Sequence, residues 1–91
     1  MALADHSGTI TAGGTAQTLM AADATRNGFS LENVSAGDLW INDVGGTAAA
    51  SQPSIKIVSG AFYETAPGQP CQSAISIYGA TTAQAFTSRS W

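Results

Sequence analysis

Apolar and polar residues alternate along two short stretches near the middle of the chain. In residues 29–32, which read FSLE, every second residue is apolar. Residues 39–42, which read LWIN, repeat the same pattern. Alternation with a period of two is typical of a β-strand that buries one of its faces. The two stretches therefore predict two strands, each with one face toward a core.

The residues between these two stretches predict how the strands pair. Ser35-Ala36-Gly37 lies between them, and a three-residue hairpin loop needs a left-handed residue of the kind that glycine supplies at its end. A hairpin over residues 26–44 places Leu31 opposite Ile41, so that the apolar residues of both strands share one face. The sequence thus predicts that the two strands are neighbours in one sheet.

The rest of the chain has the pattern of further short strands separated by turns. Strands are expected within residues 9–12, 18–20, 55–58, 61–63, 74–79 and 84–89. Residues 15–24 are compatible with a helix as well as a strand, since several of them favour helices locally. Seven or eight short strands with turns between them are typical of a sandwich or a small barrel. The predicted fold class is all-β, a compact antiparallel β-sandwich of jelly-roll or immunoglobulin-like type.

Length and charge add to this picture. A chain of 91 residues predicts one domain, and the small and polar residues 1–8 predict a flexible arm. Charged residues make up only 10% of the chain, and the net charge is −3. The three basic residues are scattered, which argues against binding to nucleic acid or to an anionic membrane. A surface so poor in charge favours association with copies of itself or with a larger assembly.

The chain offers little for catalysis or for metal binding. Cys71 is the only cysteine and His6 the only histidine, so that one chain cannot fill a tetrahedral structural zinc site. A cysteine and a histidine without a motif around them predict no nucleophile and base. A single cysteine fits a reducing compartment during folding, and the N-terminal residues predict no signal peptide. We therefore predict no enzyme activity and no cofactor.

Aromatic residues are the best candidates for contacts with other molecules. In the alternating pattern, Asp38, Trp40 and Asn42 share the face opposite the core. This group fits a covered tryptophan, an interface anchor, or a platform for a sugar ring. Tyr78 and Trp91 are similar cases. Trp91 fits two roles equally, since it can hold the last strand to its own sandwich or reach a neighbouring subunit.

Several segments together resemble proteins of tailed bacteriophages. The segments are RNGFSLENVS at 26–35, DLWIN at 38–42, GTA at 46–48 and AISIYGATTAQAFT at 74–87. They resemble small virion structural proteins that decorate or cement capsids, or that belong to the head–tail junction or the tail. The resemblance implies a compact β-sandwich, no enzyme activity, homo-oligomers that are often trimers, and partners among other phage structural proteins. It also implies synthesis in the bacterial cytoplasm and a final place in the virion.

Two functional hypotheses follow from the sequence. The first is a structural virion protein that associates with itself and binds a capsid or tail surface. The alternative is a carbohydrate-binding module or an adhesin or tail-fibre accessory domain, which would use the face of Asp38, Trp40 and Asn42.

Overall fold

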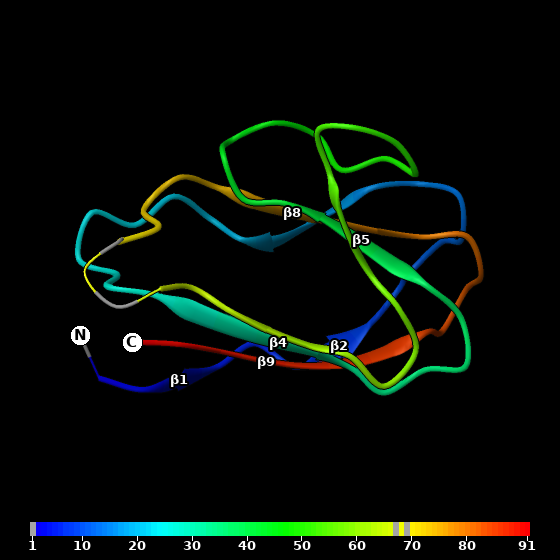
Figure 1. Ribbon diagram of the computed structural model, residues 1–91, viewed down its shortest axis with the longest axis horizontal. Coiled ribbons are helices and arrows are strands. Elements are labelled where there is room, and N and C mark those ends of the chain that lie inside the picture. Colours follow the sequence, from blue (N-terminus) through cyan, green and yellow to red (C-terminus); the bar gives the residue numbers. More distant parts are fainter. Residues whose placement is uncertain (1, 67, 69) are drawn as a thin grey trace.

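The chain folds into two antiparallel sheets packed face to face. A computed structural model describes residues 2–66, 68 and 70–91, and these residues form strands and no helix. Figure 1 shows the two sheets as separate layers. The strands are β1 (Ala4–Asp5), β2 (Gly8–Thr9), β3 (Gln17–Met20), β4 (Phe29–Asn33), β5 (Leu39–Asn42), β6 (Ile55–Ile57), β7 (Phe62–Glu64), β8 (Ile75–Gly79) and β9 (Ala85–Ser90).

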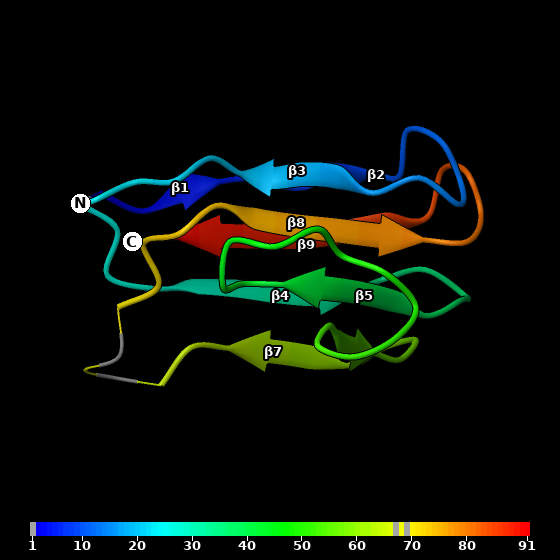
Figure 2. The same cartoon turned by 90° about the horizontal axis from the view of Figure 1, so that it is seen from above.

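The strand order in each sheet reveals one long antiparallel ribbon. One sheet has the order β1-β9-β4-β7 with β2 also beside β9, and the other has the order β3-β8-β5-β6. Strands from the first half of the chain pair with strands from the second half, namely β1 and β2 with β9, β3 with β8, β4 with β7, and β5 with β6. The ribbon folds back on itself at the connection between β5 and β6. Figure 2 shows β3 beside β8 and β4 beside β7.

The register of this ribbon is nearly constant from its ends toward its tip. The partners Ala4 and Ser90, Gly8 and Phe86, Gln17 and Ile77, and Ser30 and Glu64 have residue numbers that each add to 94. At the tip the residue numbers of the partners Leu39 and Ile57 add to 96, because Leu39 follows Glu32 by seven residues whereas Phe62, the partner of Glu32, follows Ile57 by only five. Shifting the register by two residues leaves every side chain on the same face of its sheet, since side chains alternate with a period of two.

Rolling this ribbon up gives the topology of a jelly roll. In addition to the ribbon pairs, β4 pairs with β9 and β5 pairs with β8, and these pairings join the ribbon pairs into two sheets. All connections from β2 to β9 cross between the sheets, apart from that between β5 and β6. Two sheets built in this way are the jelly-roll arrangement. The predicted all-β sandwich is confirmed, and of the two predicted types the strand order fits the jelly roll.

The predicted hairpin over residues 26–44 is wrong, although both of its strands are present. β4 belongs to one sheet and β5 to the other, so Leu31 pairs with Tyr63 and Ser88, whereas Ile41 pairs with Ile55 and Ile77. Gly37 is also not among the glycines with positive φ. Apolar faces converge on one core whether two strands lie side by side or opposite each other, so alternation alone does not distinguish the two arrangements.

The N-terminal residues also differ from the prediction of a flexible arm. Ala4 pairs with Ser90, and Gly8 pairs with Phe86, which adds β1 and β2 to the edge of a sheet. The backbone N–H of His6, between these strands, donates to the carbonyl of Ser88 at 2.7 Å. These residues therefore form part of the sandwich, and they bring the strands in the described part of the chain to nine rather than the expected seven or eight.

The core lies between the sheets and is built from alternate residues of the central strands. Its buried members are Ile10, Met20, Phe29, Leu31, Leu39, Ile41, Ile57, Ile75, Ile77 and Phe86. The predicted strand at residues 18–20 is confirmed, and it contains a β-bulge between Thr18 and Met20. Because of the bulge, Met20 is buried and Leu19 also packs against the core.

Candidate functional site

Two predicted site residues lie together on the outer face of the four-stranded sheet. Trp40 of β5 pairs with Tyr78 of β8 on one side and with Lys56 of β6 on the other. Trp40 and Tyr78 are both half-buried. The Lys56 Nζ lies 5.8 Å from the centroid of a Trp40 ring, which is within the range of a cation–π contact. Strand parity thus correctly placed Trp40 on the face away from the core, whereas the sequence did not indicate that Tyr78 and Lys56 lie beside it.

The other two members of that predicted group differ, since Asn42 is buried whereas Asp38 is exposed. Asn42 is 3% exposed, and its Oδ1 accepts hydrogen bonds from the backbone N–H groups of Val44 and Gly46, both at 3.1 Å. Asp38 forms an ion pair with Lys56 at 3.5 Å. Asn42 therefore shapes the connection after β5, and its amide is not part of the open surface that was predicted for Asp38, Trp40 and Asn42.

Trp91 lies at the end of the sandwich opposite to the connection between β4 and β5, as the position of the C-terminus in Figure 1 indicates. Its backbone N–H donates to the carbonyl of Gly28 at 3.1 Å, and the Gly28 N–H donates back at 3.0 Å. A Cβ atom on Gly28 would lie 2.9 Å from Cζ2 of the Trp91 indole. Of the two roles predicted for Trp91, the structure shows the first, since it holds β9 against the start of β4.

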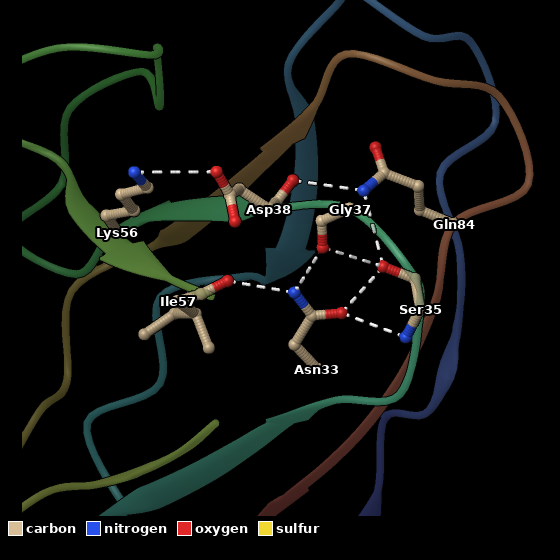
Figure 3. A network of polar contacts seen from close by, with 7 residues as sticks. All are labelled: Asn33, Ser35, Gly37, Asp38, Lys56, Ile57 and Gln84. Atoms are coloured by element: carbon tan, nitrogen blue, oxygen red, sulfur yellow. Dashed lines mark hydrogen bonds and ion pairs between the residues drawn. The ribbon is translucent and has the colours of Figure 1, made fainter. Parts of the chain in front are cut away.

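A network of buried amide side chains connects the two sheets at the Asp38 end (Figure 3). Asn33 is fully buried at the end of β4. Its Nδ2 donates to the carbonyls of Gly37 and Ile57, at 2.7 and 2.8 Å. Its Oδ1 accepts hydrogen bonds from the backbone and the hydroxyl of Ser35. Asn33 therefore holds the connection between β4 and β5 and also reaches β6 in the other sheet.

Gln84 extends this network to the connection between β8 and β9. It is 7% exposed, and its Nε2 donates to the carbonyl of Asp38 at 3.0 Å and to the hydroxyl of Ser35 at 3.3 Å. The neighbouring Ala83 has a φ of 70°, the one positive φ among the described residues other than glycine. The two connections line a shallow depression of about 490 Å³ with small side chains, at residues 35–37 and 81–85.

A buried arginine organises the opposite end of the sandwich. Arg26 is 2% exposed, and its guanidinium donates to the backbone carbonyls of Ala21, Cys71 and Ser73. These carbonyls belong to the connection between β3 and β4 and to that between β7 and β8. Because carbonyl oxygens carry partial negative charge, they compensate in part for burying the cation. Arg26 thus joins two loops that are about 50 residues apart in the sequence, which no sequence pattern indicates.

Tyr63, Asp43 and Cys71 form a second polar cluster near this end. The Tyr63 hydroxyl donates to Oδ2 of Asp43 at 2.9 Å, and the Cys71 thiol donates to the Asp43 carbonyl at 3.2 Å. Burial and the hydrogen bond to Asp43 raise the pKa of Tyr63 to about 12. Burial likewise raises the pKa of Cys71, which disfavours the nucleophilic thiolate. His6, the other residue considered with Cys71 in the sequence, has its ring 2.9 Å from the hydroxyl of Ser90.

The structure therefore divides its polar residues between structural and surface roles. The sequence did not indicate which buried polar residues link distant parts of the fold, namely Arg26, Asn33 and Gln84. Within the described part of the chain, no group of three His, Cys, Asp or Glu side chains is placed to hold a metal ion. None of the described residues forms a helix long and apolar enough to cross a membrane. The candidate surface is the outer face around Trp40 and Tyr78.

Comparisons with known proteins do not assign the chain to a family. No protein-family model matches it, and no match was found among curated proteins or among solved structures. The resemblance to phage virion proteins therefore stays a prediction that rests on the sequence segments alone.

Proposed function

We propose that the chain is a structural protein of a tailed-bacteriophage particle, where it associates with copies of itself and binds the capsid or tail surface to decorate or stabilise it. The observation that carries this proposal is the jelly-roll topology, a fold used by many viral coat domains. This support is an analogy between folds, since one fold hosts many functions. The low proportion of charged residues is compatible with a surface that is covered by other protein.

The outer face of the four-stranded sheet supplies a contact surface for this role. Trp40 and Tyr78 are aromatic residues of the kind enriched in protein interfaces, and they are half-buried on neighbouring strands. Trimers, which the resemblance implies, would bring three such faces into one assembly. The proposed place of action is the virion, after synthesis in the host cytoplasm.

Fractionation of phage particles tests this function directly. Particles from a lysate in which the gene is expressed are purified on a density gradient, and the chain is quantified in them by mass spectrometry. We expect many copies per particle and a gold-labelled antibody on the capsid or tail surface in electron micrographs. A chain that stays in the soluble fraction, with no copies on particles, would contradict the proposal.

Carbohydrate binding is the second candidate, because Trp40 and Tyr78 lie side by side and jelly rolls also occur in lectins. A glycan array with the wild-type chain and with Trp40→Ala tests it, and Trp91→Phe serves as a control at an aromatic residue on another part of the molecule. Binding that is lost only with Trp40→Ala would favour this candidate. An array without signal, or with a signal that Trp40→Ala leaves unchanged, removes it.

A further inference from the structure

The edge strand β7 presents backbone groups, at the side of the five-stranded sheet, that pair with none of the described residues. β7 pairs with β4 and is the last strand in the sheet order. On both sides of β7 the odd-numbered residues face β4, since the Ala61 carbonyl accepts from Asn33 at 3.0 Å and the Thr65 N–H donates to Phe29 at 3.1 Å. Backbone groups of antiparallel strands alternate in direction. Phe62 and Glu64 therefore direct their N–H and C=O groups away from β4, toward the open edge.

The other three sheet edges carry features that hinder pairing with another strand. The edge formed by β1 and β2 is interrupted at Ser7, whose N–H and hydroxyl bond to the Asp5 carboxylate. β3 contains the bulge between Thr18 and Met20. β6 carries the charged Lys56, and its Ile57 carbonyl accepts the Asn33 side chain. Bulges, interruptions and lysines are the usual protections of edge strands.

β7 has no bulge, interruption or lysine, and it exposes an aromatic ring. Phe62 is 60% exposed on the outer face of the sheet, and Val34, which follows β4 directly, is 52% exposed. The N–H of Gly60 donates to the Asn33 carbonyl at 2.8 Å, which holds this end of β7 beside β4. The edge is therefore fixed in place, apolar at one end and free of lysine and proline.

We propose that a second copy of this chain pairs with β7 in antiparallel fashion, about a two-fold axis at Tyr63. Phe62 then exchanges both backbone hydrogen bonds with Glu64 of the second copy, and the two five-stranded sheets become continuous. This inference names the surface for the self-association in the proposed function and rests on it. A trimer would need a head-to-tail contact elsewhere, because a two-fold contact joins copies only in pairs.

The side chains select this register among the neighbouring ones. Moving the axis to Glu64 would place two carboxylates directly opposite each other, which is destabilising. Moving the axis to Phe62 would bring Gly60 into the pairing, but its φ of 80° is not an extended conformation. The register centred on Tyr63 avoids both and uses the whole strand.

The contact is short, and this sets its expected strength. A pairing of three residues per copy buries much less than the ~1,600 Å² of a standard interface, so the isolated dimer is weak. Many copies held on one particle would raise the effective concentration and make the same contact persistent. In solution, therefore, the dimer is expected to appear only as the protein concentration increases.

Sedimentation velocity from about 10 µM to about 1 mM tests the proposal. Glu64→Pro removes the backbone N–H that points to the open edge, and it leaves the hydrogen bonds between β7 and β4 in place. The matched control Glu64→Gln loses the same charge but keeps that N–H. We expect the wild type and Glu64→Gln to shift toward dimer as concentration increases, and Glu64→Pro to remain a monomer. Equal association of both variants, or a wild type that is monomeric throughout, would overturn the proposal.

Amide hydrogen exchange of the wild-type chain gives a second test that needs no variant. Increasing the concentration should slow exchange at Phe62 and Glu64, while Tyr63 and Thr65 keep their rates. Equal rates at low and high concentration for Phe62 and Glu64 would exclude this edge as the interface. Such a result would not contradict the proposed structural role in the particle. Fractionation of particles tests that role separately, by comparing the amounts of wild type and Glu64→Pro on purified particles.

Discussion

Asn33 donates a hydrogen bond from its side chain to the carbonyl of Ile57 at 2.8 Å and thereby links a strand of one sheet to a strand of the other. Replacing Asn33 by Ala leaves the buried carbonyl of Ile57 without this donor, and it also removes the hydrogen bonds of the Asn33 amide to Gly37 and Ser35. Each unsatisfied buried group costs about 1–3 kcal/mol. We expect Asn33→Ala to lower the free energy of unfolding by at least about 2 kcal/mol, measured by urea denaturation.

The exposed Asn27 provides the control for this change. Asn27→Ala removes the same side chain where solvent can replace it, so we expect a change within about 0.5 kcal/mol. Equal losses for both variants would show that the Asn33 network contributes nothing specific.

Trp91 leaves no room for a side chain at Gly28. A Cβ there would lie 2.5 Å from Oγ1 of Thr65 and 2.9 Å from the Trp91 indole. Gly28→Ala is therefore expected to destabilise the chain by about 1–3 kcal/mol, as overpacking does, and to shift tryptophan fluorescence. Gly8→Ala is the control, since its Cβ would meet Phe86 at an ordinary 3.5 Å. A Gly28→Ala chain as stable as Gly8→Ala would contradict the packing of Trp91.

Ala83 holds a left-handed backbone conformation that alanine rarely adopts. Its N–H donates to the carbonyl of Ile10 at 2.8 Å, which helps to maintain the conformation beside Gln84. Glycine adopts a positive φ without the steric cost of about 1–2 kcal/mol that other residues incur. Glycine also increases the entropy of the unfolded chain, which offsets part of this benefit. We therefore expect Ala83→Gly to raise the free energy of unfolding by at most about 1 kcal/mol and the melting temperature slightly.

Ala80 in the same connection has no positive φ and serves as the comparison. There, glycine brings only its entropic cost, so Ala80→Gly should lower the melting temperature. Opposite signs for the two variants are the expected outcome, and a loss of stability in both would argue against strain at Ala83.

Tyr63 makes stability depend on pH in the alkaline range. Its folded pKa of about 12 lies above the ordinary value of 10, so the folded chain retains the phenolic proton more strongly than the unfolded chain. The stabilisation is complete below pH 10 and is lost as the pH increases toward 12. We expect Tyr63→Phe to be less stable at pH 7 by about 1 kcal/mol and to lose less stability than the wild type between pH 10 and 12.

Absorbance of the phenolate checks the origin of this effect. The difference in titration between the wild type and Tyr63→Phe should show one group that ionises near pH 12. An Asp43→Asn variant keeps an acceptor oxygen without the negative charge and should titrate at lower pH. An unchanged titration in that variant would mean that Asp43 does not contribute to the shift.

The sequence predicted where the strands lie better than how they pair. Alternation located β4, β5 and β8, because burial of one face is a local pattern. It could not place β4 and β5 in different sheets, because their apolar faces converge on the core in either arrangement. Pairing between residues such as Ala4 and Ser90 depends on the whole ribbon, and no local pattern encodes it.

The candidate site shows the same division. Trp40 and Tyr78 were correctly placed on an outward face, since strand parity determines this. Asn42 was placed on that face as well, but its amide turns to the backbone of the following loop. The burial of Arg26 arises where two distant loops meet, which is a property of the folded chain and not of its neighbouring residues.

The pairing within the ribbon also makes the force needed to unfold the molecule depend on the direction of pulling. Ala4 and Ser90 are direct neighbours, so tension applied between them peels β1 from β9 one hydrogen bond at a time. Tension between Ala4 and Ala85 pulls β1 and β9 along their length in opposite directions and loads all the bonds of that pair together. Single-molecule extension should therefore need less force with handles at the first pair of residues than at the second.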